Sequence, residues 1–112
     1  MHQIIFYLAM NDKQIRKMIG DSVHKVDPKA EVILFGSRAR GDARKDSDWD
    51  VLIIVDTPKV TEEQFETLNY DLWLKGLELG QEINPIIYTR DRWNAPIPSV
   101  FKYNIRKEGV VL

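Results

Sequence analysis

Apolar residues recur along the chain with two different spacings, which predict alternating helices and strands. After Asn11 and Asp12, both good N-cap residues, they follow at helical intervals as far as Asp27-Pro28, where the proline ends the helix. Residues 31–35, apolar after Glu31, and the uninterrupted apolar run 51–55 are typical of buried strands, and the second strand is expected to span residues 49–55.

The C-terminal half predicts a long helix, a third strand and a short last helix. Thr61 to Gln64 fits a capping box, and Gly80 suits the residue after a helix. The strand at about residues 82–88 contains Pro85, which indicates an edge position or an early end to pairing. Residues 92–98 are expected to be irregular and residues 100–107 helical, so the element order predicts a small α/β (α+β) sheet protein.

Aromatic and apolar side chains give a first estimate of the core. Trp49 and Trp73 are expected to be buried, and Trp93 either packs on the sheet edge or meets a partner. Tyr88, Phe101 and Tyr103 are expected to pack, although aromatics among cations can also stack bases. The apolar positions of the long helix are Phe65, Leu68, Leu72, Trp73, Leu77 and Leu79.

The first residues do not fit a secretion signal, because no basic segment precedes the apolar run Ile4–Met10. Either this run is a short strand or cap, or Met10 is the true initiator and residues 1–9 are not native. We therefore expect an N-terminal extension over residues 1–11 and one domain over residues 12–112.

The composition excludes several classes of function. With no cysteine in 112 residues, the chain lacks a disulfide scaffold and a Cys-ligated metal, which suits a reducing, cytoplasmic location. A net charge of −1 argues against direct nucleic-acid binding, and no apolar run is long enough to span a membrane. The charge is uneven, since residues 56–89 are acidic and residues 90–112 basic.

One segment combines residues that carry chemistry. Gly36-Ser37 follows a buried strand, and Asp48-x-Asp50 opens the next strand ten residues later. Positions i and i+2 of a strand share a face, so both aspartates project together. Adjacent carboxylates repel one another unless a cation lies between them, and oxygen ligands suit Mg²⁺ or Mn²⁺. The pattern therefore indicates a site for a metal and a phosphate-bearing substrate.

The residues around this pair suit a polyphosphate. Gly36 allows the backbone to approach a ligand closely, and Ser37 offers a hydroxyl and an N–H. Arg38, Arg40 and Arg44 can neutralise phosphate charge. These are the parts of a metal-assisted nucleotidyl-transfer site.

The same residues resemble the signature of the minimal nucleotidyltransferases in the DNA polymerase beta superfamily. Residues 33–44 and 47–53 are similar to that family nearly residue by residue, and the similarity covers about residues 12–112, a whole domain. It implies a mixed sheet with helices packed on it, two divalent ions, and transfer of AMP or another nucleotide from a nucleoside triphosphate such as ATP.

The resemblance departs from the family at a third acidic position. The complete family site has a third carboxylate on the strand after the long helix, where this chain has Asn84. Asn84 can offer a metal a neutral oxygen but cannot act as a general base. Glu82, two residues earlier on the same face, either reaches the site or lies in solvent. Asp48 and Asp50 are thus the implied catalytic metal ligands, and Glu82 and Asn84 are alternatives for completing the set.

Three functions follow from the resemblance, and they belong to different classes. The first is an enzyme that transfers AMP from Mg-ATP to a hydroxyl. Small relatives are typically encoded beside a helical partner of the HEPN type, and some modify a tyrosine of that toxin, which implies an antitoxin. The second is a binding module that masks a partner and keeps a vestigial nucleotide site; a structural relative that senses ATP is a third.

The length leaves no second domain to enclose a small acceptor, so we expect a protein to dock on the basic residues 90–107. A homo-oligomer is left open.

Overall fold

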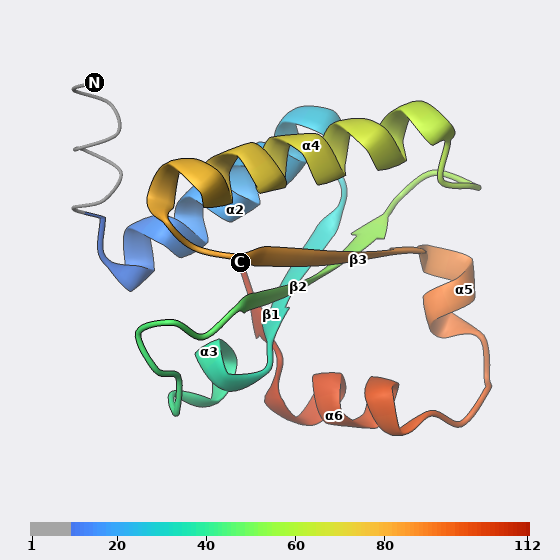
Figure 1. The fold of residues 1–112 in the computed structure, drawn as a ribbon. Helices are drawn as coiled ribbons and strands as arrows, with labels where there is room; N and C mark the ends of the chain where they lie inside the picture. The colour runs from blue at the N-terminus through green and yellow to red at the C-terminus, as the bar shows by residue number, and fades with distance from the viewer. Residues whose placement is uncertain (1–9) are drawn as a thin grey trace.

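Four strands form one mixed sheet in the order β3-β2-β1-β4 in the computed structural model, which describes residues 10–112 (Figure 1). The expectations for Ile4 to Ala9 lie outside the described residues, and the division at residue 12 stays a prediction. The elements are α2 (Asp12–Val26), β1 (Glu31–Phe35), α3 (Ser37–Arg40), β2 (Trp49–Val55), α4 (Glu62–Leu79), β3 (Ile83–Thr89), α5 (Arg90–Asn94), α6 (Val100–Glu108) and β4 (Val110–Val111).

The two long helices begin at reciprocal capping boxes. At α2 the Asn11 side chain accepts from the Gln14 N–H at 2.9 Å, and the Gln14 side chain accepts from the Asn11 N–H at 3.0 Å. Thr61 and Gln64 make the same exchange at the start of α4. These bonds satisfy N–H groups that have no partner within a helix. Gly80 then ends α4 with a φ of 67°, so all three boundary predictions are confirmed.

The strand register places the ends of three strands side by side. β1 and β2 are antiparallel with Phe35 opposite Asp50, while β2 and β3 are parallel with Asp50 opposite Asn84. The Trp49 N–H donates to the Glu82 carbonyl at 2.8 Å. By alternation the backbone of Pro85, which has no N–H, faces the free edge of β3. The predicted edge position of this strand is confirmed.

Helices cover the two faces of the sheet unequally (Figure 1). α2 and α4 lie on one face, where they enclose the larger core with Trp49, Val51 and Ile53 of β2. α5 and α6 lie on the other face, and their core contains Leu52 and Ile54. Because β2 is covered on both sides, its apolar run has no alternation, as predicted.

The predicted core needs correction on α4 and α6. Trp49 is fully buried and Trp93 is 7% exposed, but Trp73, Phe65 and Leu77 are 58%, 54% and 64% exposed. Trp73 and Leu77 lie on the flank of α4 that faces β3, where they line a cavity with Ile83 and Asn84. Phe65 is exposed near the start of the helix, although it lies in line with the buried stripe. The buried residues of α4 are Leu68, Leu72, Gly76 and Leu79. Tyr103 is also exposed, whereas Tyr88 and Phe101 pack as expected.

Two further elements differ from the sequence expectation. α5 falls within the segment predicted to be irregular, and it begins where the Thr89 hydroxyl accepts from the Arg92 N–H at 3.2 Å. β4 was not predicted; it pairs antiparallel with β1, opposite Ile33 and Leu34. Within residues 10–112, no helix combines the length and the apolar character needed to cross a membrane.

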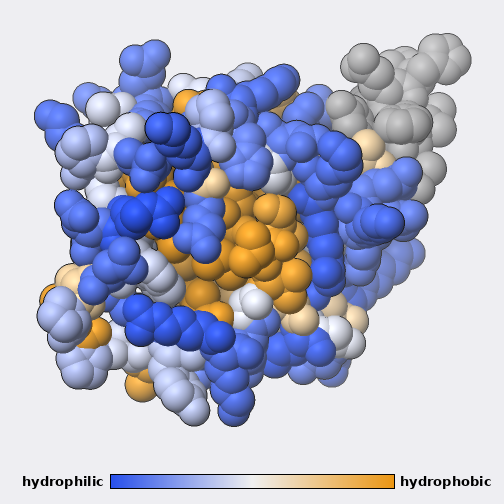
Figure 2. All heavy atoms as spheres, turned by 180° about the vertical axis from the view of Figure 1, so that it is seen from behind, coloured by the Kyte–Doolittle hydropathy of each residue, from blue (hydrophilic) through white to orange (hydrophobic). Residues whose placement is uncertain are grey.

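The edge of the sheet formed by β4 lies at the back of the view in Figure 1 and is seen in the reverse view of Figure 2. Figure 2 shows apolar atoms gathered in the middle of this view and framed by hydrophilic residues. Val111, which is 67% exposed, belongs to this edge. This edge lies opposite β3 in the strand order.

Candidate active site

The aspartate pair lies where β1 ends and β2 begins. Asp48 precedes β2 and Asp50 is its second residue, so by alternation both project from the face that carries α6. Gly36 follows β1 with φ 75° and ψ −159°, a conformation almost restricted to glycine. A Cβ on Gly36 would lie 2.5 Å from Asp50 Oδ2, so the glycine makes room for this carboxylate. The sequence prediction that these residues meet is therefore matched by their placement.

Asn84 lies beside the pair and Glu82 lies at its margin. The Asn84 Nδ2 donates to Asp48 Oδ2 at 3.2 Å, and Asn84 is directly opposite Asp50 in the register. The Glu82 side chain is exposed, while its backbone carbonyl pairs with Trp49. Of the two candidates for the third position, Asn84 is thus the one in contact with a site aspartate.

The donor set suits a hard divalent cation bound together with phosphate. Asp48 and Asp50 offer carboxylate oxygens on one face, and rotation of the Asn84 amide would present a neutral oxygen. Within residues 10–112 no cluster of three or more His, Cys, Asp or Glu side chains could hold a metal. Two carboxylates with substrate phosphates and water match the way in which Mg²⁺ is usually bound.

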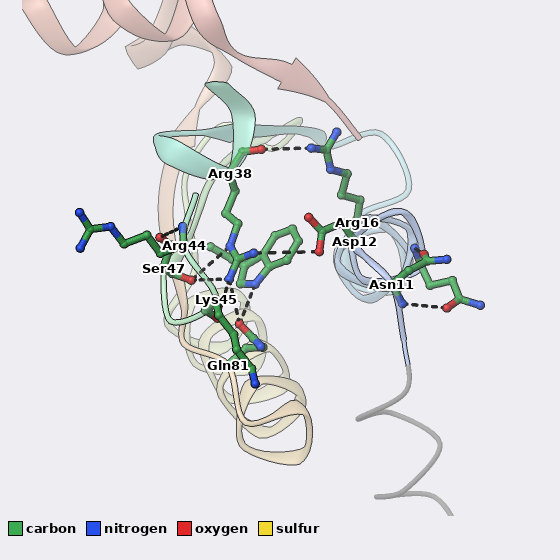
Figure 3. A network of polar contacts seen from close by, with 10 residues as sticks. Asn11, Asp12, Arg16, Arg38, Arg44, Lys45, Ser47 and Gln81 are labelled. Atoms are coloured by element: carbon green, nitrogen blue, oxygen red, sulfur yellow. Dashed lines mark hydrogen bonds and ion pairs between the residues drawn. The ribbon is translucent and has the colours of Figure 1, made fainter. Parts of the chain in front are cut away.

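The three arginines near the pair lie in different surroundings. Arg40 is partly exposed and pairs with Asp42 and Glu108 at 3.3 and 3.4 Å. Asp42 first, and Glu108 second, hold the pKa of Arg40 above its ordinary value. The Arg44 side chain extends away from its neighbours (Figure 3). Arg40 and Arg44 thus remain predicted phosphate contacts.

Arg38 points to the opposite face of the sheet (Figure 3). Its guanidinium lies 4.6 Å from the centre of the Trp49 ring, and its side chain is 8% exposed. Trp49 belongs to the core beneath α2 and α4, while Asp48 and Asp50 face the other way. The predicted phosphate contact of Arg38 is untested, but the guanidinium is occupied elsewhere in the structure.

Sequence reasoning missed Gln81. Its Oε1 accepts from Trp49 Nε1 and from Arg38 Nη2, both at 3.2 Å (Figure 3). Gln81 lies in the turn between α4 and β3, and nothing in its sequence context marks it. Only the register of β2 against β3 brings it beside Trp49.

Shallow cavities flank the strand ends on two sides. One of about 200 Å³ is lined by residues of β1, α3 and α6, including Gly36, Arg40 and Asn104. Another of about 300 Å³ lies between α4 and β3, and is lined by Trp73, Leu77 and residues 81–84. The first cavity thus includes Gly36, which lies beside Asp50, and the second includes Asn84, which is bonded to Asp48.

Comparisons with known proteins found one family model and similar proteins. The family model of the nucleotidyltransferase domain matches residues 15–111. A protein of Methanocaldococcus jannaschii, named as a candidate protein adenylyltransferase, is 39% identical over 83 residues, which cover 73% of this chain and 76% of the relative. A crystal structure of a candidate nucleotidyltransferase from Sulfolobus solfataricus gives a TM-score of 0.49 at 22% identity, over 98% of this chain and 82% of that chain.

Proposed function

Since the chain belongs to the nucleotidyltransferase domain family and is a nucleotidyltransferase, we propose that it transfers AMP from Mg-ATP to a hydroxyl of a protein. The observation that carries the proposal is the placement of Asp48 and Asp50 against Gly36 at the ends of β1 and β2. Similarity to a relative named for protein adenylylation supports the choice of donor and acceptor.

The proposed reaction is an in-line displacement at the α-phosphorus. The acceptor oxygen bonds to phosphorus, pyrophosphate leaves with the electrons of the broken P–O bond, and the hydroxyl proton passes to a carboxylate of the site. Asp48 and Asp50, with the Asn84 oxygen, would hold Mg²⁺ or Mn²⁺, which supplies charge stabilisation at the phosphoryl oxygens. Ser37, Arg40 and Arg44 would position the triphosphate, so the chain contributes mainly orientation and charge neutralisation.

The proposed partner is the helical HEPN-type protein implied by the family resemblance, with this chain as its antitoxin. The exposed side of α6 offers a docking surface, because Val100 and Tyr103 are 78% and 65% exposed there. Arg106 is on the same helix and lines a cavity of about 440 Å³ with them. A partner with an acidic, partly apolar face would complement this surface. The cytoplasmic location stays a prediction.

Co-expression with the product of the adjacent gene, followed by intact-mass spectrometry, tests this function. We expect an adduct of one or more AMP units on the partner, and its loss in Asp48→Ala. Asp46→Ala is the matched control, because Asp46 is an exposed aspartate of the same loop and should leave the adduct unchanged. An adduct that persists in Asp48→Ala would remove the site assignment.

One observation favours the second candidate function, a module that neutralises a partner by binding. Asn84 donates an N–H to Asp48 where the family has a carboxylate, and this arrangement holds the pair without a third acid. A stable complex between wild-type protein and partner, with no adduct in the presence of Mg-ATP, would support masking. Absence of both complex and adduct would contradict the antitoxin role.

A further inference from the structure

We propose that Arg38 is a positioning residue of the reaction, which fixes the site strands relative to each other from the opposite face of the sheet. The inference rests on the proposed assignment of Asp48 and Asp50 as the metal-holding pair. It gives Arg38 a different role from the phosphate contact that the sequence suggests. The two roles make different predictions in the absence of nucleotide.

A single guanidinium joins the two segments that lead into β2 and β3 (Figure 3). Arg38 Nη2 donates to the Ser47 carbonyl at 2.9 Å and Nε donates to the same oxygen at 3.2 Å. Nη2 also lies 3.2 Å from the Lys45 carbonyl and from Gln81 Oε1. Ser47 directly precedes Asp48, and Gln81 directly precedes Glu82. One side chain is therefore bonded to the segments that lead into both strands.

The remaining contacts hold Arg38 itself in place. The Arg38 guanidinium stacks over the ring of Trp49, which is fully buried. Trp49 is the residue between Asp48 and Asp50 in the sequence. Asp12 Oδ1 at the start of α2 lies 4.0 Å from Arg38 Nη1, and Arg16 Nη2 donates to the Arg38 carbonyl at 3.1 Å. Residues of α2 thus contact both the guanidinium and the backbone carbonyl of Arg38.

The chemistry of the contacts selects arginine over lysine. A buried charge is costly unless its donors are satisfied, and a planar fork can serve several carbonyls at once. A lysine would keep the charge but offer one compact ammonium. Residues 44–46 of the loop ahead of Asp48 are exposed, and Arg38 adds a bond to the Lys45 carbonyl to the two bonds between Arg44 and Ser47 within the loop.

Weakening the hydrogen bonds of the Arg38 guanidinium should lower the metal affinity and the activity of the site formed by Asp48 and Asp50. A displacement of about 1 Å at a catalytic group can reduce the rate about 10²-fold. Residues that orient metal ligands typically contribute 10- to 100-fold to metal affinity. Arg38→Lys should therefore weaken Mn²⁺ binding by about 10-fold or more, even without nucleotide.

The test is a titration of nucleotide-free protein with Mn²⁺, followed by electron paramagnetic resonance. Arg38→Lys and Gln81→Ala should both lower Mn²⁺ affinity, Gln81→Ala by less because the Ser47 and Lys45 contacts remain. Hydrogen exchange at residues 44–48 should increase in both variants, which reports loop order directly. Arg90→Lys is the matched control: Arg90 pairs with Glu31 and Asp56, away from the starts of β2 and β3, and should leave affinity unchanged.

Three outcomes distinguish a positioning role of Arg38 from a phosphate contact and from a wrong assignment of the metal site. Unchanged Mn²⁺ affinity in Arg38→Lys and Gln81→Ala, with weaker Mg-ATP binding by calorimetry in Arg38→Lys alone, would overturn positioning in favour of a phosphate contact. Wild-type Mn²⁺ affinity in Asp48→Ala would instead show that the proposed site is wrong. If Arg38→Lys fails to fold, Gln81→Ala decides, since it leaves the guanidinium in place, and wild-type affinity in Gln81→Ala would count against the proposal.

Discussion

Trp49 and Asp50 are neighbours in one strand, yet their side chains lie in opposite surroundings. On the Trp49 side, the ring is fully buried, its indole N–H is bonded to Gln81, and a guanidinium covers it. On the Asp50 side, no hydrogen bond within residues 10–112 holds the carboxylate, which lies against the bare backbone of Gly36. A period of two residues lets one strand serve both the core and the site.

This difference assigns separate tasks to the two faces. Around Trp49 the structure is closely packed, and the indole N–H and the Arg38 guanidinium are bonded within the protein, which supplies rigidity. Around Asp50 the carboxylate oxygens stay available for a ligand. Changes at Trp49 should therefore alter stability, and changes at Asp50 should alter binding and rate.

Asp50→Asn should have the largest effect, and it should be on function. Removing one of the paired charges weakens the hold on a cation worth several kcal/mol to the transition state, so AMP transfer should fall by about 10⁴-fold. Calorimetry with Mg-ATP should show weaker binding, while the melting temperature should change little. Equal Mg-ATP affinity in wild type and Asp50→Asn would contradict the contrast between the faces.

The Trp49 and Asp50 contrast was accessible from the sequence, because Asp-x-Asp ahead of an apolar run fixes which residues share a face. The bounds of the two long helices also followed, since capping boxes and glycine leave local signals, whereas α5 and β4 were not predicted. The site was predictable less completely. The occupied guanidinium of Arg38 and the role of Gln81 depend on register between distant segments. Likewise, periodicity could not decide which apolar face of α4 meets the sheet, because the helix has two.

Trp49→Ala should have the next largest effect, and it should be on stability. Truncating a fully buried tryptophan typically costs about 3–5 kcal/mol, and here it also removes the surface on which Arg38 stacks. Chemical denaturation should show this loss. Trp49→Phe, which keeps a ring but no N–H for Gln81, should lose less; equal losses in both would indicate that the hydrogen bond matters more than packing.

Asn84→Asp should have an intermediate effect whose sign depends on metal. Without a cation, a carboxylate 3.2 Å from Asp48 replaces an N–H donor, which should lower stability by on the order of 1 kcal/mol. With saturating Mn²⁺ the variant should be stabilised more than wild type, and AMP transfer should rise. Thermal melts with and without Mn²⁺ test this. Glu82→Gln is the comparison: if it lowers transfer while Asn84→Asp changes nothing, Glu82 completes the site.

Trp73→Ser should have the smallest effect and marks the limit of the comparison. Trp73 is 58% exposed on the flank of α4 that faces β3, and its ring centre lies 6.1 Å from that of Tyr70. A surface substitution of this kind usually changes the free energy of unfolding by less than about 0.5 kcal/mol. The same denaturation experiment as for Trp49→Ala would place the two tryptophans on one scale. Leu68→Ser, a buried position of the same helix, is the matched control and should be far more costly. A large loss in Trp73→Ser would mean that this flank of α4 is covered in solution, and that the helix, like β2, is buried on more than one side.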